Sequence, residues 1–251
     1  MAGKQFDNLG EFISAMAGMA MSKAFENLEG FDKTKFRMDQ PDGKKLEELD
    51  LEGVQISSIA LLGPDTVKVI AGDKLAIEVV GEPEADDGLR FKLEDGKLAI
   101  MRAGKRSGQS VTVTVTTPSL RKISLMGSGS VHCATLSGDD AKIQIAGSGS
   151  AICDKVAVGK LKVRVMGSGS LVASGKAEKL SLKIAGSGSA KLDALETGAA
   201  KINIMGSGGG SFASDGEVEA NMAGSGSVVV KGRARCKVKG MGSGSVVCEP
   251  A

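Results

Sequence analysis

Short runs of alternating apolar and polar residues fill most of this chain, and after residue 120 they recur at a fixed interval. A Gly-Ser-Gly-Ser tetrad returns every 18 to 20 residues, and only its fifth copy is altered. The tetrads begin at Gly127, Gly147, Gly167, Gly186, Gly206, Gly224 and Gly242. A repeat of this length is typical of stacked units that are each too small to bury a core alone.

The residues on either side of each tetrad predict two strands. Apolar side chains occupy the positions two and four before the first glycine, as in Leu125 and Ile123, with polar ones between them. Apolar side chains return four and six residues after it, as in Val131 and Cys133. Alternate side chains of a strand point to opposite faces, so each strand has one apolar face. The pattern predicts an all-β fold: a parallel, right-handed β-helix, or β-solenoid, with coils of about 20 residues.

The position directly before each tetrad alternates between methionine and alanine without exception. This column reads Met126, Ala146, Met166, Ala185, Met205, Ala223 and Met241. Alternating large and small side chains fill a confined interior without overlap. We therefore expect the column to face the core, with each thioether between two methyl groups.

Three regions of the chain differ in pattern. In residues 1–30, apolar residues such as Phe6 and Leu9 recur at helical spacing, which predicts a short amphipathic N-terminal helix. We expect this helix to be an end cap, a partner helix or an interfacial membrane anchor. Residues 31–120 contain less regular strand-like runs, which we interpret as irregular coils that open the solenoid or a small sheet domain leading into it. Residues 121–251 form the regular Gly-Ser-Gly-Ser solenoid.

Composition excludes several classes of function. The chain has no Trp, no Tyr and seven Phe, so it lacks the aromatic platforms on which nucleic-acid bases stack, and we expect no sequence-specific nucleic-acid partner. The tetrads have neither the lysine of a phosphate loop nor the aspartate of calcium-binding solenoid repeats. No run of 18 apolar residues predicts a membrane span. We expect no enzyme: no catalytic, cofactor-binding or metal-binding residues, and no cofactor.

The four cysteines and the single histidine are further candidates for chemistry. Cys133, Cys153 and Cys248 fall in one inward column and are predicted to be buried thiols, while Cys236 is expected to be a plain surface cysteine among basic residues. Their redox state stays open. His132 occupies an outward position, and no acid or oxyanion hole is evident beside it. The serines of the tetrads are expected to form ladders that bond internally, with a glycan-binding face as the less favoured interpretation.

A column of basic residues is the best candidate for a binding surface. Lysine recurs five residues before the tetrads, and further basic residues lie three residues before them. Like charges stacked about 4.8 Å apart repel each other unless counterions compensate. We expect either a solvated face or a surface for a polyanion such as a polysaccharide. The candidate residues are Lys122, Lys142, Lys162, Arg164, Lys183 and Lys201.

Residues 50–248 resemble a known family, the head GIN domain of autotransporter adhesins. The resemblance rests on residues 89–100 (LRFKLEDGKLAI), on residues 111–120 (VTVTVTTPSL) and on the Gly-Ser-Gly series that follows. It implies a right-handed parallel β-helix of a bacterial protein, largely exported or envelope-associated, without enzymatic activity. The family supplies no catalytic residues to carry over.

Two functional hypotheses remain beside an unsupported third, a carbohydrate-active enzyme. The first is a non-enzymatic structural or adhesive solenoid that presents a repetitive surface. The second is a cytosolic scaffold that associates end to end as a homo-oligomer, similar to bactofilins, because the terminal coils are apolar. The absence of a clear signal peptide favours the cytoplasm, whereas the family resemblance favours the cell envelope.

Overall fold

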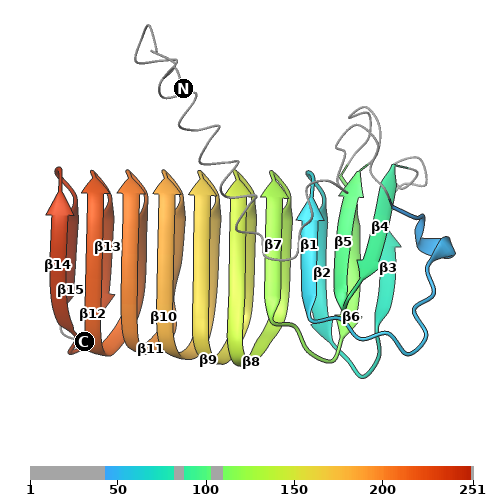
Figure 1. The fold of residues 1–251 in the computed structure, drawn as a ribbon, viewed down its shortest axis with the longest axis horizontal. Coiled ribbons are helices and arrows are strands. Elements are labelled where there is room, and N and C mark those ends of the chain that lie inside the picture. Colours follow the sequence, from blue (N-terminus) through green and yellow to red (C-terminus); the bar gives the residue numbers. More distant parts are fainter. Residues whose placement is uncertain (1–42, 82–87, 103–109, 250–251) are drawn as a thin grey trace, which may run out of the picture. The chain divides into compact units, whose positions relative to one another are not determined.

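The computed structural model describes residues 43–81, 88–102 and 110–249, which lie within one compact unit. The predicted all-β solenoid is confirmed: the described strands join in one parallel-rich sheet that winds around an apolar core (Figure 1). The helix predicted for residues 1–30 lies outside the described residues.

Each regular coil is a single long strand that runs from one tetrad to the next and bends at the polar turn. Five such strands stack in parallel register, and three shorter strands complete the C-terminal end. They are β8 (Ser130–Gly147), β9 (Ser150–Gly167), β10 (Ser170–Gly186), β11 (Ser189–Gly206), β12 (Gly209–Gly224), β13 (Ser227–Lys231), β14 (Arg235–Met241) and β15 (Ser245–Glu249).

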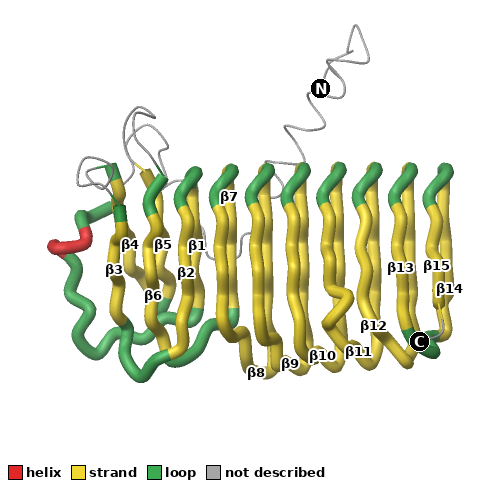
Figure 2. The backbone as a smooth tube through the Cα atoms, turned by 180° about the vertical axis from the view of Figure 1, so that it is seen from behind, coloured by secondary structure: helices red, strands yellow, loops and turns green. Residues whose placement is uncertain are grey.

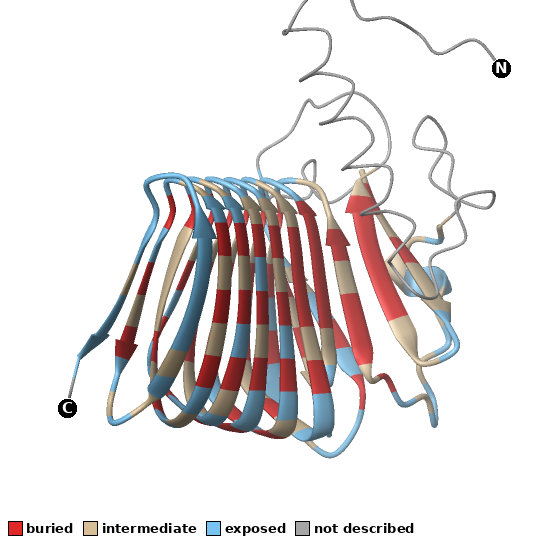
Figure 3. Cartoon of the chain, turned by 60° about the vertical axis from the view of Figure 1, so that its left-hand side comes forward, coloured by how far each residue is buried: buried red, intermediate tan, exposed pale blue. Residues whose placement is uncertain are grey.

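This continuous sheet bends around the core, so its strands form two facing layers, which we call the first sheet and the second sheet. The first sheet contains the segments that lead into each tetrad, and the second sheet contains the segments that follow it. The first half of β12 pairs with β13 in the second sheet, whereas its second half pairs with β14 in the first sheet. Buried and exposed bands alternate along these strands, as expected when one face of each sheet covers the core (Figure 3).

Glycine is required at the corners for two different reasons. The first glycine of each tetrad has a positive φ, such as 119° at Gly147, a conformation that L side chains rarely adopt. A Cβ on the third residue, such as Gly149, would lie 2.6 Å from the carbonyl oxygen of Gly129 and 2.7 Å from Cδ2 of Leu125. The corners therefore stack directly on one another, as the row of turns along one edge of Figure 2 shows.

The N-terminal coils do not follow chain order. Strand β1 lies between β5 and β7 in the first sheet, and β2 lies between β6 and β8 in the second. Two antiparallel strands, β3 and β4, form the outer edge there, and a 3-10 helix, η2, precedes β1. These elements are η2 (Leu46–Glu48), β1 (Ser58–Leu62), β2 (Thr66–Ala71), β3 (Ala76–Val80), β4 (Leu89–Glu94), β5 (Lys97–Arg102), β6 (Thr112–Thr117) and β7 (Lys122–Gly127).

A buried ion pair joins two of these N-terminal coils. The carboxylate of Asp65, in the β1–β2 corner, is 0% exposed and accepts a hydrogen bond from Nε of Arg102 at 3.0 Å. The backbone N–H of Val111 donates to the same carboxylate at 3.0 Å. Asp65 therefore ties the corner of its own coil to the beginning and the end of the connection between β5 and β6.

The methionine–alanine column faces outward, so the prediction that it fills the core is wrong. The residues two and four before each tetrad face inward, so the positions one and three before it, the first of which is this column, point away from the core. Within the column, Met126 is 9% exposed, but Met205 is 66% and Met241 is 80% exposed. The core is filled instead by columns such as Leu98, Ile59, Ile123, Ile143, Val163, Leu182, Ile202 and Ala220, each 0% exposed.

Two of the four cysteines form a disulfide, which the sequence interpretation missed. Cys133 and Cys153 are buried free thiols as predicted, but Cys236 and Cys248 are bonded to each other. They lie six residues before and six residues after Gly242, and these positions face each other across the coil. The disulfide thus connects β14 and β15, the strands on either side of the last tetrad, which we together call the last coil. Cys248 is exposed, because no described coil follows to cover it.

Candidate functional site

The structure places the predicted basic residues on the outer surface of the first sheet. Lys122, Lys142 and Lys162 are in direct register on β7, β8 and β9. Ser181 takes the equivalent position on β10, and Lys201 follows on β11. One column therefore carries four of the six candidates along five successive strands.

The other two candidates lie in a neighbouring column of the same surface. Arg164 on β9 is in register with Lys183 on β10, and both point outward. A third column, which the sequence interpretation did not include, adds Lys160 and Lys179 in register on the same two strands. We call this surface the basic face. It consists of Lys122, Lys142, Lys160, Lys162, Arg164, Lys179, Lys183, Lys201, Arg235, Lys237 and Lys239, with Asp140, Glu217 and Glu219 as its acidic members.

An open depression of about 610 Å³ lies on the basic face. Its floor contains the small side chains of Ser181, Ala199 and Ala200, where neighbouring coils carry longer ones. Charged residues surround this floor: Lys160, Lys179, Lys201, Lys237, Lys239, Glu217 and Glu219. The lining is basic overall, and the depression has the shape of a shallow trough rather than a closed pocket.

The acidic residues of this region are held ionised by their neighbours. A hydrogen bond from Lys237 and the charge of that ammonium lower the pKa of Glu217. Lys201, whose Nζ lies 3.0 Å from a carboxylate oxygen of Glu219, lowers the pKa of that carboxyl in the same way. Lysine and glutamate side chains on neighbouring strands therefore pair in the last coils. By contrast, Lys160 and Lys179 are two exposed lysines in direct register with each other.

His132 has an acid partner that the sequence did not reveal. Its Nε2 lies 2.7 Å from Oδ2 of Asp154, one coil further along the second sheet. The sequence did contain a sign of this contact. The histidine lies five residues after the first glycine of one tetrad, and the aspartate lies seven residues after the first glycine of the next. The nearby hydroxyl of Ser174 donates to the backbone carbonyl of Asp154 instead of approaching the imidazole. The pair lies half-exposed on an open surface and lacks the arrangement of a nucleophile with its base.

The two free thiols are buried in the core, where Cys133 donates a hydrogen bond to the backbone carbonyl of Thr135 at 3.2 Å. Cys133 and Cys153 are in register on β8 and β9. The neighbouring Cys153 thiol lowers the pKa of Cys133, whereas the neighbouring Cys133 thiol and burial raise the pKa of Cys153 well above its ordinary value. A protonated thiol of this kind packs as a small apolar side chain and is a poor nucleophile.

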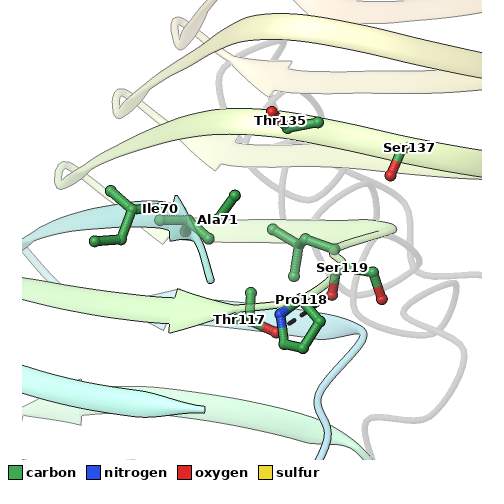
Figure 4. Close-up of a pocket in the computed structure, with 9 residues that line it drawn as sticks. Ile70, Ala71, Thr117, Pro118, Ser119, Thr135 and Ser137 are labelled. Carbon is green, nitrogen blue, oxygen red and sulfur yellow. Dashed lines mark hydrogen bonds between the residues drawn. The ribbon is translucent and has the colours of Figure 1, made fainter. Parts of the chain in front are cut away.

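A second, much smaller cavity lies where β2 and β6 end beside β8 (Figure 4). Its volume is about 40 Å³, and Ile70, Thr117 and Pro118 are among its lining residues. A space of this size holds a few water molecules. Among the described residues, no group of three or more acidic, histidine or cysteine side chains is arranged to bind a metal ion.

Several solved structures share this architecture. The chain is similar to a "putative adhesin" from Bacteroides fragilis NCTC 9343, with 21% identity, a TM-score of 0.70, and coverage of 78% of this chain and 93% of that one. A "putative adhesin" from Parabacteroides merdae ATCC 43184 is 22% identical with a TM-score of 0.63, over 78% and 92% of the two chains. A "putative lipid binding protein" from Parabacteroides distasonis ATCC 8503 is 21% identical with a TM-score of 0.61, over 79% and 94%. At these identities the likeness shows the fold alone.

Comparison with protein families is more specific. No curated protein matches the chain. Within the described ranges, the structure contains no helix that is long and apolar enough to cross a bilayer. Residues 56–234 match the model of the family described as "Putative auto-transporter adhesin, head GIN domain". That match covers most of the chain, and the protein therefore belongs to the head GIN domain family of adhesin-like β-solenoids.

Proposed function

We propose that this protein is a non-catalytic, adhesin-type solenoid that binds an extended polyanion along its basic face. The observation that carries the proposal is the stack of like charges in the middle of that face, which form no ion pair with any described residue, although Asp140 lies in register with Lys160. Lys160 and Lys179 are adjacent and exposed, and Lys162 lies between Arg164 and Lys160 on the same strand. A bound anion would relieve this repulsion.

The shape of the surface favours a long ligand over a small one. The columns repeat at about 4.8 Å along the solenoid, so a linear chain with regularly spaced anionic groups could contact several coils at once. The shallow trough beside Ser181 and Ala199 offers room for such a chain without enclosing it. Because the protein has no Trp or Tyr on which bases could stack, an acidic polysaccharide fits better than a single-stranded nucleic acid.

The disulfide between Cys236 and Cys248 supports action in an oxidising compartment. Disulfides persist in secreted and envelope proteins and are rare in the reducing cytosol. Together with the family, this bond favours the cell envelope or its exterior over the cytoplasm as the place of action, where acidic polysaccharides are natural partners.

Binding of heparin and polygalacturonate over a range of salt concentrations tests the proposal. We expect the triple variant K162S/R164S/K183S to bind at least about tenfold more weakly and with a shallower salt dependence, because three charge contacts are lost. The matched control is K68S/K155S/K191S, which removes the same charge from exposed positions on the second sheet. An equal loss in both variants would mean that net charge, and not the basic face, governs binding.

A further inference from the structure

The last described coil exposes side chains that every earlier coil buries. Val238 on β14 continues the inward column whose preceding members, from Leu98 to Ala220, are all 0% exposed, yet Val238 is 50% exposed. Cys248 on β15 likewise continues an inward column that is at most 2% exposed from Cys133 to Val230, yet Cys248 is exposed. Figure 3 shows mainly exposed residues at this end of the stack. The C-terminal coil thus presents part of the core cross-section to its surroundings.

The backbone at this end is also available for pairing. Among the described strands, β14 pairs only with β12, and β15 pairs only with β13. One edge of each strand therefore has no described neighbour, and an unpaired strand edge is a template for an added strand. The Cys236–Cys248 disulfide holds the two strands together, so the edge is ordered before any partner arrives.

The charges on β14 select what can pair there. Its outward residues are Arg235, Lys237 and Lys239. Along the edge of β14 that is paired with β12, these three residues lie opposite Glu217, Glu219 and Asn221 in direct register. Strand β12 thus shows which sequence complements β14: acidic residues or asparagine at alternate positions, with apolar residues between them that cover the core.

A second copy of this chain is a poor occupant of the edge. If two β14 strands paired antiparallel about Val238, Lys237 of one copy would face Lys239 of the other. At the opposite end of the solenoid, the outermost strand of the first sheet, β4, carries Arg90 and Lys92 at outward positions. Tail-to-tail association would therefore bring like charges together, and in head-to-tail association Glu94 would be the single acidic residue of β4 that faces β14.

We propose that the free edge of β14 binds an extended segment of another protein in which acidic and apolar residues alternate. The segment adds one more strand to the first sheet, its acidic side chains contact Arg235 and Lys237, and its apolar side chains cover Val238. This contact differs from polyanion binding in that it needs the strand edge, although Lys237 and Lys239 also line the depression on the basic face.

A peptide with the sequence of residues 217–223, Glu-Val-Glu-Ala-Asn-Met-Ala, is the probe, because it reproduces the strand that already complements β14. Binding of the blocked peptide to the intact protein is measured by calorimetry and by NMR shifts of backbone amides. We expect shifts confined to β14, β15 and the adjacent part of β12. The version with lysine in place of both glutamates is expected to bind at least about tenfold more weakly, since it places like charges opposite each other.

A charge exchange makes the test specific. In K237E/K239E the preference should reverse, so that the lysine peptide binds and the glutamate peptide does not. The control K155E/K191E changes net charge equally on the second sheet and should keep the original preference. The single variant K239E is tested in case the double variant is poorly folded. It should weaken binding of the glutamate peptide several-fold. Absence of peptide binding at millimolar concentration, shifts spread over the middle of the basic face, or an unchanged preference in K237E/K239E would each overturn the proposal.

Discussion

The two ends of the solenoid treat exposed core and strand edges in different ways. At the N-terminal end, β3 and β4 run antiparallel to their neighbours, and the chain doubles back so that β1 is enclosed between β5 and β7 (Figure 1). The same inward column is half-buried at Leu93 on the edge strand β4 and 0% exposed at Leu98 on β5, but it is 50% exposed at Val238 at the C-terminal end. The N-terminal end is closed by chain topology, whereas the last described strands at the C-terminal end are parallel to their neighbours and are tied together by a disulfide.

This difference teaches where the stability of a stacked fold comes from. Interior coils are covered on both sides, so their contacts are the same whichever coil is considered. An end coil has one covered side and needs an additional device. The N-terminal end uses a buried ion pair between Asp65 and Arg102, and the C-terminal end uses a covalent bond and surface charge.

The largest effect is expected from placing one lysine at either end of the same column. Leu98→Lys buries an unpaired ammonium in a fully covered position and should destabilise the fold by more than about 4 kcal/mol, or prevent folding. Val238→Lys places the same group at a half-exposed position and should cost less than about 1.5 kcal/mol. Thermal unfolding of the two variants checks this, and similar losses would mean that the C-terminal coil is as well covered as the N-terminal one.

A smaller but still large loss is expected from breaking the buried ion pair. Arg102→Met leaves the fully buried carboxylate of Asp65 without its cation and should cost about 3–5 kcal/mol. The matched control is Lys176→Met, which breaks the exposed pair with Glu196 and should cost less than about 1 kcal/mol. Urea unfolding separates the two cases. A neutral Arg102→Met would show that Val111 and its neighbours alone satisfy Asp65.

The disulfide should stabilise its own coil more than the whole protein. C236S/C248S frees a loop that the bond closes, and closing a loop of this size is worth about 3 kcal/mol in the unfolded-chain picture. Because the coil lies at one end, we expect faster hydrogen exchange in β14 and β15 and little change in β8 to β11. A uniform increase in exchange across the stack would instead show that the last coil unfolds together with the others.

The sequence predicted the regular coils well because each position in them repeats. The tetrad and its flanking apolar columns establish strand, corner and inward face from Ile123 onward, with the period itself as the signal. The methionine–alanine column was misassigned because its alternation resembles core packing, although the two-residue period of the strand required it to face outward. The order of β1, β5 and β7 could not be predicted, since nothing local to those strands specifies which neighbours they choose.

The sequence predicted which lysines of the candidate site line up on successive strands, but it did not predict all the basic residues of the site. Lys122, Lys142 and Lys162 line up because the repeat length is constant across those coils. Lys160 and Lys179 were missed because they belong to the turn-proximal part of the coil, where the sequence has no fixed pattern. The Cys236–Cys248 bond depends on contact across one coil, and equal offsets of six residues on either side of Gly242 were its signal.

The smallest expected effect distinguishes the charged C-terminal coils from the rest of the stack by pH. The pKa values of Glu217 and Glu219 lie below the ordinary value of 4.5, chiefly because Lys237 and Lys201 donate hydrogen bonds to them. A carboxyl whose pKa is lowered in the folded state contributes stability above its unfolded pKa and loses it as the pH falls through the folded pKa. Acidification below 4.5 should therefore increase hydrogen exchange in β12 and β14 before it affects β8 and β9. Both carboxylates are exposed, so salt should mask most of the effect. In Glu217→Gln/Glu219→Gln the pH dependence at this end should disappear, and its persistence would assign it to other carboxyl groups.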